Sequence, residues 1–450
     1  MKLPLAPPDP LTLLRDVAPK LLPALLQQAT PTPQGKYLHW DELRHREPPG
    51  DLSHEDWWLS VYLARQPMLK ALPFQDKVGN DFYLSSPEPV LMHLHHIDQD
   101  AAGQIRTPES APIHDNRERY LLHSLIEESI TSSQLEGAST TRRVAEAMLR
   151  EGRTPRDRGE KMIFNNYQAM EHIRGLRDEP ITPERILDLH RMLTMDTLDD
   201  PNDAGRLRTT DDVNVVDNRD GTILHAPPTH RDLPERLERL CKFANARTDS
   251  SPFVHPVVRA ILLHFMLGYD HPFVDGNGRT ARALFYWSTA RSGYWLMEFL
   301  SISQFLRRAP RQYVQAYLHT ETDHNDTTYF VLHQLGTIRR GIAALHDHLA
   351  QKTKERRDAE RLLARAGPLR SHLNHRQVAL LTHALKHPGE PYRVAKHQAV
   401  HNVVYQTARA DLLDLESLGL LVKEQRGNAF EFFAVDDLMR AIDLIGKRLD

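Results

Sequence analysis

The chain has 450 residues, and at roughly 150 residues per domain this length predicts two to four domains. Hydrophobic residues make up 40% of the chain and charged residues 26%, which is typical of a globular protein and excludes wholesale disorder. The 57 Lys and Arg residues nearly balance the 60 Asp and Glu residues, so the net charge of −3 excludes a basic surface over the whole molecule, although not a local basic patch.

The single cysteine, Cys241, excludes a disulfide scaffold and a cysteine-based zinc site, and its apolar, helix-like surroundings predict a buried core residue. No apolar stretch approaches the ~18 residues that a transmembrane helix needs. Pro and Asp interrupt the first ten residues, where a signal peptide needs an unbroken apolar run. We therefore expect a cytoplasmic protein without membrane contact.

Residues 1–99 form the first predicted region. The first 35 residues are rich in proline, and one short amphipathic helix is expected within residues 11–28. Ser53 stands three residues before Asp56 and just ahead of an aromatic run, which predicts a capped helix start.

Residues 100–348 are predicted to form a mainly helical domain, with its core at about 180–345. Apolar residues at helical spacing, together with the Thr182-Pro183 start signal, indicate the helices. The expected helices cover residues 121–126, 182–193, 233–246, 257–268 and 279–292. Between them, residues 213–225 read as two short strands around a Gly-containing loop, which predicts a β-hairpin.

Residues 349–373 are predicted to be a basic helix and linker, and the character of the chain changes again over residues 374–450. Short helices followed by alternating strand residues around Gly427 predict a winged helix-turn-helix domain. Basic residues that could meet DNA phosphates are Arg393, Lys396, Arg409 and Arg426. Acidic residues on or near the expected recognition helix are Asp411, Asp414 and Glu416. DNA binding and a protein-interaction or dimerisation role therefore both stay open.

The most informative stretch is residues 271–282, His-Pro-Phe-Val-Asp-Gly-Asn-Gly-Arg-Thr-Ala-Arg, which links two predicted helices. Gly276 and Gly278 can adopt backbone conformations closed to other residues and expose N–H groups at a helix start, which favours an anion site. The other Gly-rich phosphate loop, the P-loop, is excluded because its Gly-x₄-Gly-Lys-Ser/Thr order is absent. Phe273 is expected to anchor the loop as an apolar plug.

The charged residues and the histidine of this stretch indicate phosphate binding, a metal ligand and a base. Arg279 and Arg282 are three residues apart and share a helix face, from which both could hold phosphate oxygens. Asp275 supplies a hard oxygen ligand suited to Mg²⁺. His271, with an ordinary pKa near 6.5, suits general base catalysis. Together these residues predict a site for nucleotide phosphate, a metal ion and a base.

This stretch resembles, position for position, the active-site motif of the Fic family, HPFx(D/E)GNGRxxR, and the resemblance covers roughly residues 100–345. It implies a mainly helical fold and transfer of AMP from ATP to a protein hydroxyl, with release of pyrophosphate. It further implies that His271 takes the hydroxyl proton and Asp275 holds Mg²⁺ (or Mn²⁺). Asn277 and the loop amides would orient the α-phosphate, while Arg279 would hold the β-phosphate and Arg282 the γ-phosphate.

A second resemblance lies upstream, where Ser132 to Gly137 match the family's inhibitory motif, (S/T)xxxE(G/N). The resemblance implies that Glu136 pairs with Arg282, the guanidinium that should hold the γ-phosphate, and so prevents productive ATP binding. The alternative is a solvated glutamate near a helix end.

The family resemblance also assigns roles to two further features. The hairpin at 213–225 corresponds to the flap, whose exposed strand edge can align an extended target segment by β-augmentation. Tyr313 and Tyr317, one helical turn apart, are expected to wall the adenine pocket, with core packing as the alternative.

These observations lead to one favoured function. We expect a mainly α protein, a Fic helical domain with a β-hairpin flap plus a C-terminal winged helix-turn-helix domain. It would act as an adenylyltransferase on a Ser, Thr or Tyr hydroxyl of a target protein and of itself, autoinhibited by Glu136. The alternatives are a de-AMPylase using Glu136 and a nucleotide-sensing, DNA-binding regulator. The expected partners are ATP and a hydroxyl-bearing target protein, with DNA and a second copy of the chain as further expectations. The identity of the target is not readable from the sequence.

Overall fold

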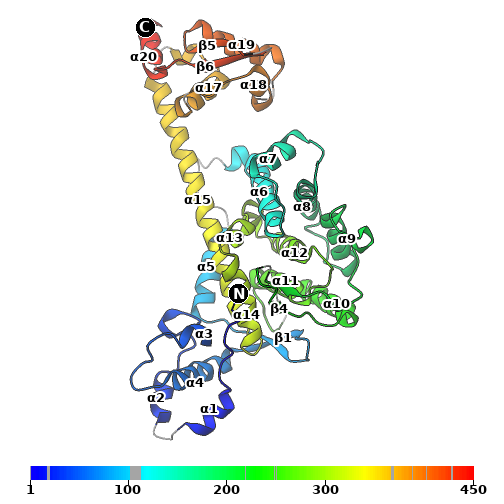
Figure 1. The fold of residues 1–450 in the computed structure, drawn as a ribbon. Coiled ribbons are helices and arrows are strands. Elements are labelled where there is room, and N and C mark those ends of the chain that lie inside the picture. The colour runs from blue at the N-terminus through cyan, green and yellow to red at the C-terminus, as the bar shows by residue number, and fades with distance from the viewer. Residues whose placement is uncertain are drawn as a thin grey trace. The chain divides into compact units, whose positions relative to one another are not determined.

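The computed structural model describes residues 2–17, 21–101, 113–217, 219–247, 249, 251–365, 369–387, 389–401, 403–426 and 429–449. The chain divides into two compact units, Met1–His346 and Asp347–Asp450 (Figure 1). Among the described residues, strands occur only as three two-stranded antiparallel sheets, and the remaining elements are helices. The predicted mainly α fold class is confirmed.

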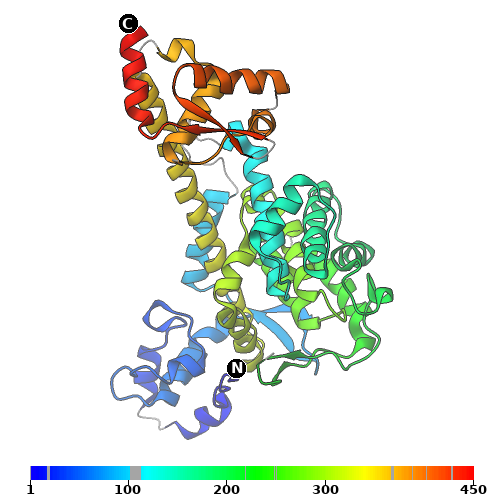
Figure 2. The ribbon, with the colours of Figure 1, turned by 45° about the horizontal axis from the view of Figure 1, so that its top comes forward.

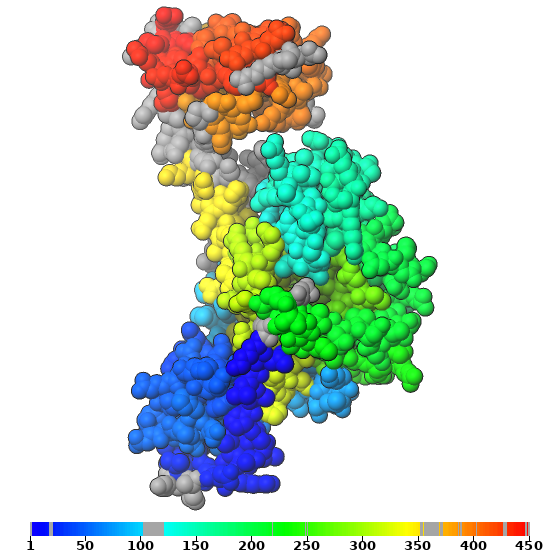
Figure 3. Space-filling model, in the orientation of Figure 1, coloured from blue at the N-terminus to red at the C-terminus, as the bar shows by residue number. Residues whose placement is uncertain are grey.

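The first unit begins with a small helical lobe, blue in Figure 3. It consists of α1 (Pro10–Asp16), α2 (Leu22–Gln27), α3 (Trp40–Leu43) and α4 (His54–Arg65). The next elements, β1 (Lys70–Gln75), β2 (Asp81–Leu84) and α5 (Glu88–Ala101), pack into the main core of the helical domain. Ser53 and Asp56 form the predicted capping box at the start of α4. The single helix expected within residues 11–28 was wrong. Two helices stand there, because Pro23 is tolerated in the first turn of α2 but would break a continuous helix.

The rest of the first unit is the expected helical domain, and the predicted helices and hairpin are confirmed. Its elements are α6 (Ile113–Leu135), α7 (Arg142–Glu151), α8 (Arg158–Gly175), α9 (Pro183–Thr194), β3 (Val215–Val216), β4 (Ile223–His225), α10 (Leu233–Ala244), α11 (Pro256–Asp270), α12 (Asn277–Arg291), α13 (Ile302–Arg308), α14 (Pro310–Thr322) and the first part of α15 (Thr328–Arg365), which continues past the boundary into the second unit. Cys241 is buried in α10, as predicted, and burial raises the pKa of its thiol to about 12.

Helices α11 and α12 form the centre of this domain (Figure 2). Helix α11 is apolar on nearly every face, and Leu262, Leu263 and Phe265 are fully buried, as expected for a helix packed on all sides. Helix α12 is also buried along most of its length, although it carries Arg279 and Arg282. The structure thus buries two guanidinium groups in the core, which requires partners that compensate their charge. In the part of the chain that the structure describes, no helix is long and apolar enough to cross a membrane.

The hairpin formed by β3 and β4 has short strands and a tight turn. Val215 pairs with His225 and Val216 with Ile223, and Gly221 adopts a positive φ of 72° in the turn. Position 218 of the predicted loop lies outside the described residues.

The second unit has its own hydrophobic core, centred on Leu381, Leu412, Leu415 and Phe432. Its elements are α16 (Leu369–His372), α17 (His375–Lys386), α18 (Val394–His401), α19 (Tyr405–Ser417), β5 (Leu421–Arg426), β6 (Ala429–Ala434) and α20 (Leu438–Leu449). The expected helices and hairpin are present in the expected order, although the turn residues 427 and 428 lie outside the described residues. The assignment to the winged helix-turn-helix class stays a prediction.

One acidic residue of α19 does not lie where the sequence suggested. Asp411 is buried and accepts hydrogen bonds from Arg376 at 2.7 and 2.9 Å, and it contacts His397 at 3.1 Å. It therefore belongs to an internal polar network and adds no negative charge to the exposed face of the helix. This removes one of the three acidic residues that weighed against DNA binding.

Candidate active site

The loop between α11 and α12 is shaped by two residues in the left-handed region. His271 ends α11 with φ 45°, and Gly276 caps the start of α12 with φ 87°. A Cβ on Gly276 would lie 2.6 Å from Thr194 Cγ2, so this position needs glycine for both conformation and space. Gly278 differs from expectation, because it lies inside α12 with helical geometry. A Cβ there would overlap Glu136 Oε1, so its glycine is explained by close approach.

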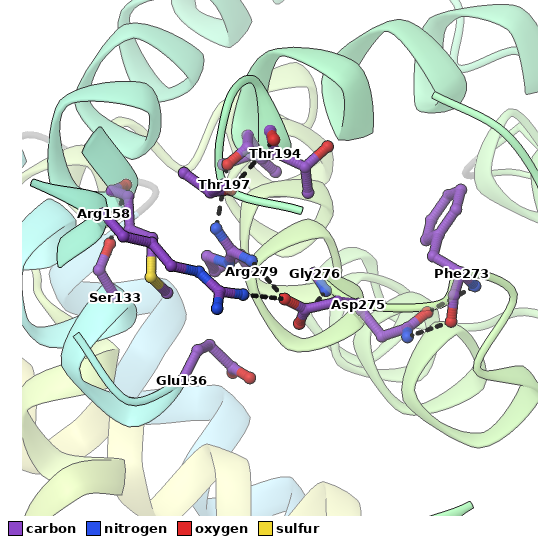
Figure 4. A network of polar contacts seen from close by, with 12 residues as sticks. Ser133, Glu136, Arg158, Thr194, Thr197, Phe273, Asp275, Gly276 and Arg279 are labelled. Carbon is purple, nitrogen blue, oxygen red and sulfur yellow. Dashed lines mark hydrogen bonds and ion pairs between the residues drawn. The ribbon is translucent and has the colours of Figure 1, made fainter. Parts of the chain in front are cut away.

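Side chains brace this loop from within. Asn277 Oδ1 accepts a hydrogen bond from Phe273 N at 2.9 Å, and its Nδ2 donates to Phe273 O at 2.8 Å (Figure 4). Phe273 is fully buried and stacks on His190, with the ring centroids 3.7 Å apart, which confirms the predicted plug. Because the Asn277 amide is committed to the loop, its role toward an α-phosphate stays a prediction.

His190, on α9, is a positioning residue that the sequence did not indicate. Its Nδ1 accepts a hydrogen bond from Gly205 N at 2.9 Å and its Nε2 donates to Asp275 O at 2.8 Å, which is the pattern of a neutral imidazole. Burial lowers the pKa of His190 to about 4. The only signal in the sequence was a histidine on the apolar side of a helix, which carries no indication of its partner.

His271 has a lower pKa than the ordinary value near 6.5. Burial lowers its pKa to about 4, so the expectation of an unperturbed value near 6.5 was wrong. Its Nδ1 lies 3.3 Å from Gly268 O, and a proton there leaves the lone pair on Nε2. Arg208, another residue that the sequence did not indicate, holds the loop: its Nε donates to His271 O at 3.0 Å and its backbone N–H donates to Pro272 O at 2.9 Å.

The upstream motif meets the loop at Arg282. Glu136 Oε1 lies 2.7 Å from Arg282 Nη2, and Arg282 also donates from Nε to Ser132 Oγ at 2.8 Å and from Nη2 to Ser132 O at 3.0 Å. Gly137, with φ 92°, ends the turn that follows α6. Glu136 is an exposed residue just after the end of α6, and its carboxylate is nevertheless engaged by a guanidinium that is 2% exposed.

A second cluster surrounds Asp275, whose side chain is half-buried. Figure 4 shows two guanidinium groups pointing at this carboxylate, and Asp275 Oδ2 lies 3.5 Å from Arg279 Nη2 and 3.7 Å from Arg158 Nη2. Asp275 Oδ1 accepts a hydrogen bond from Gly276 N at 2.6 Å. Arg158, at the start of α8, was not indicated by the sequence, since it lies more than 110 positions from the motif.

Arg279 is held in the core with unused hydrogen-bonding capacity. It is 1% exposed, and its Nη1 donates to Leu193 O at 3.0 Å. Its Nε and Nη2 have no hydrogen-bond partner among the described residues. Buried donors without acceptors are costly, and an anionic ligand would satisfy them.

A cavity of about 200 Å³ opens beside the loop. The structure brings together at this cavity Glu136, His271, Asn277, Gly278, Arg282, Tyr313 and Tyr317. The hairpin contributes Val215, Leu224 and His225 to its wall. Both tyrosines also pack on the core, since Tyr317 stacks on Phe265 at 5.0 Å and Tyr313 bonds His264 at 2.8 Å. Tyr313 and Tyr317 thus both line the cavity and pack on the core.

Comparisons with known proteins agree with this arrangement. Residues 180–288 match the Fic/DOC family. Proteins named protein adenylyltransferase Fic from Drosophila virilis and Drosophila ananassae are 31% and 30% identical over 198 residues, which is 44% of this chain and 38% and 37% of theirs. The match thus spans less than two fifths of these relatives. A solved Fic family protein from Desulfovibrio desulfuricans G20 has a TM-score of 0.50 at 18% identity, covering 78% of this chain and 96% of that one, which indicates a shared fold.

The fold and the loop together define a mainly helical protein with a glycine-containing turn between two buried helices. The matched residues contain this turn. Residues 180–288 form a Fic domain.

Proposed function

We propose that this protein transfers AMP from ATP to the hydroxyl of a Ser, Thr or Tyr residue of a target protein, and of itself, and that Glu136 restrains the reaction. The observation that carries the proposal is the cavity where a neutral His271, the start of α12 and Arg282 meet, with Glu136 engaging Arg282 at 2.7 Å. The names of the curated relatives support the same reaction class.

The reaction needs a base, a site, or cradle, that binds the phosphates, and a leaving group that departs from the side of the α-phosphorus opposite the attacking hydroxyl. His271 Nε2 takes the proton of the target hydroxyl as its oxygen forms a bond to the α-phosphorus. The bond from this phosphorus to the bridging oxygen of the β-phosphate breaks, and pyrophosphate leaves. A pKa of about 4 keeps His271 ready to accept a proton at neutral pH. A bound triphosphate would raise this pKa, because negative charge favours the imidazolium.

The cradle is formed by the first turn of α12 and by the two buried guanidinium groups. The first N–H groups of a helix have no intrahelical acceptor and attract anions. Arg279 Nε and Nη2 donate no hydrogen bond to a described residue, although Nη2 lies 3.5 Å from Asp275 Oδ2, and Arg282 would be freed for phosphate when Glu136 moves away. Both arginines can bind phosphate oxygens bidentately.

Asp275 fits the role of a single protein ligand for Mg²⁺ or Mn²⁺. Mg²⁺ in nucleotide sites takes one or two carboxylates with phosphate oxygens and water, and Asp275 is a half-exposed carboxylate beside the cradle. When bound, the ion would neutralise negative charge on the α- and β-phosphates. Arg158 and Arg279 now face the same carboxylate oxygen and would have to yield part of this contact.

Glu136 would restrain the reaction in two ways, because it occupies donors of Arg282 and takes up space in the cavity. The cavity of about 200 Å³ lies below the ~300 Å³ at which small-molecule sites begin, and Glu136 is one of the residues that line it. A carboxylate on Arg282 competes directly with a γ-phosphate for the same donors. Removal of this side chain should therefore both enlarge the cavity and free the guanidinium.

The test measures AMP incorporation from α-labelled ATP with Mg²⁺. The Glu136→Gly variant should incorporate more label than the natural protein, and Glu136→Gly combined with His271→Ala should incorporate none. Glu136→Asp is the matched control, because it retains the charge but shortens the reach. Equal incorporation with and without His271 would refute the proposed base. Glu136-dependent release of AMP from a modified target, without incorporation by any variant, would instead support the reverse reaction.

A further inference from the structure

A second cavity, of about 300 Å³, lies in the first unit away from the Fic loop. It is enclosed by the end of α4 in the N-terminal lobe and by the turn between α14 and α15. The residues that matter for its chemistry are Trp58, Tyr62, Arg65, Tyr83, Asp323 and Asp326. The Fic motif and the inhibitory motif contribute none of them.

The walls of this cavity are aromatic. Trp58, Tyr62 and Tyr83 line it from α4 and β2. Aromatic faces attract cations, and the same region already holds three such contacts. The Arg65 guanidinium lies 3.6 Å from the ring centroid of Tyr37, 5.5 Å from that of Trp58 and 5.7 Å from that of Tyr329.

The floor of the cavity carries a carboxylate with an unused oxygen. Asp323 is 6% exposed, and its Oδ2 accepts a hydrogen bond from Tyr329 OH at 2.6 Å and lies 4.0 Å from Arg65 Nη1. No described residue hydrogen-bonds its Oδ1. In Asp326, by contrast, both oxygens are used, by Thr328 N at 3.0 Å and by Tyr37 OH at 2.5 Å. This second oxygen of Asp323 is therefore available to a group bound in the cavity.

The charges around the cavity do not balance. Asp323 and Asp326 face Arg65 as the one buried cation among the described lining residues. All three kinds of donor on Arg65 point at neutral acceptors, Pro31 O, Tyr329 OH and Leu38 O. Burial raises the pKa of Asp323 and of Asp326, with the positive charge of Arg65 opposing this rise. One further positive charge would compensate the pair.

We propose that this cavity is a binding site for an alkyl-ammonium or guanidinium group. Asp323 Oδ1 would accept a hydrogen bond from this group, and the aromatic walls would enclose it. The cation belongs either to a free small amine or to the side chain of an arginine or lysine in a peptide. The proposal is independent of adenylyl transfer, because it uses none of the residues of the Fic loop.

Calorimetric titration of the full chain at pH 8 tests the proposal with four probes. Agmatine stands for a free small cation and N-acetyl-arginine amide for a side chain, while 1-butanol and propionate are a neutral and an anionic control. Both cations, or one of them, should bind, and both controls should not. Binding of agmatine alone supports a free amine, and tighter binding of the capped arginine supports a peptide.

Two sets of variants locate the binding. Asp323→Asn should weaken binding at least tenfold, because it removes the charge that the probe meets. Gln66, an exposed residue at the rim, allows a milder test that leaves the core intact. Gln66→Lys places a tethered ammonium at the mouth and should abolish binding of the free cation, whereas Gln66→Met, of similar size and without charge, should preserve it. Absence of binding by either cation at millimolar concentration, or equal binding by Gln66→Lys and Gln66→Met, would overturn the proposal.

Discussion

The imidazole side chains of His190 and His271, at the Fic loop, are in the neutral form. His190 and His271 both have a pKa of about 4, in each case because burial disfavours the charged imidazolium. His190 is fully buried and links α9 to the loop through Gly205 N and Asp275 O. A proton on its Nδ1 would break the first of these bonds, so the loop geometry depends on pH.

We expect the free energy of unfolding to fall as the pH is lowered from about 6.5 toward 4. The pKa of His190 is depressed in the folded state, so its contribution is complete above the unfolded pKa near 6.5 and is lost as the pH falls through the folded pKa. For this residue the loss is on the order of 3 kcal/mol. Urea unfolding at pH 7 and pH 4 measures it.

The matched comparison is His190→Gln, which cannot titrate, against His45→Gln at an exposed position. The first variant should show a weaker dependence of stability on pH than the natural protein, and the second the same dependence. An unchanged pH dependence in His190→Gln would rule out this residue as the source.

Arg158 is expected to compete with the metal ion for Asp275. Its guanidinium lies 3.7 Å from Asp275 Oδ2, and both side chains are partly exposed, so the pair is worth at most about 1 kcal/mol. Arg158→Ala, in the Glu136→Gly background, should therefore lower the Mg²⁺ concentration for half-maximal AMP incorporation by up to about fivefold. Arg177→Ala removes an exposed positive charge elsewhere and should leave this concentration unchanged. A higher Mg²⁺ requirement in Arg158→Ala would instead assign Arg158 to phosphate binding.

The sequence predicted the loop residues because their motif is a local pattern, and the pairing of Glu136 with Arg282 was implied by the family resemblance. It did not predict Arg158, His190 or Arg208, since each reaches the loop from a distant element and belongs to no motif. The lowered pKa of His271 was also beyond reach, because it is caused by burial in the assembled fold.

At the scale of elements, the position of α6 decides whether Glu136 meets Arg282. Glu128 lies on α6, eight residues before Glu136, which stands in the turn just after this helix. Glu128 is 2% exposed and accepts hydrogen bonds from Ser301 Oγ at 2.9 Å and Ser303 N at 3.1 Å. These bonds fix α6 to the start of α13. A fixed α6 would present Glu136 to the cavity, so Glu128 would act as a positioning residue for the proposed restraint.

Glu128→Gln should loosen this attachment, because a neutral amide replaces one of the two acceptor oxygens. We expect a loss of stability of about 1–3 kcal/mol and AMP incorporation above that of the natural protein but below that of Glu136→Gly. Glu151→Gln, at an exposed position on α7, is the control. Reduced stability with unchanged incorporation would mean that α6 stays in place without this anchor.

At the scale of the whole molecule, all residues placed at the active site belong to the first unit. A chain that ends at residue 365, after α15, should therefore retain His271-dependent AMP incorporation within about twofold in the Glu136→Gly background. Incorporation by the truncated and full-length variants, each with and without His271→Ala, measures this. A large loss on truncation, with the first unit still folded by circular dichroism, would assign the second unit a part in the reaction.

The fold was predictable where patterns are periodic or capped. The helices of the Fic domain and the Ser53 capping box were found because their signals are local. Two features were not predicted. One is the division of the first expected helix at Pro23, and the other is the short amphipathic helix α20. In both cases the sequence signal is weak without the packing partners of the helix.

The most direct test of the central claim is the intact mass of the Glu136→Gly protein after incubation with ATP and Mg²⁺. The account predicts a gain of one or more AMP units on the chain itself, absent from the natural protein and from the variant that also carries His271→Ala. A chain whose mass does not change, although ATP binding to the same variant is measured, would contradict adenylyl transfer by this site.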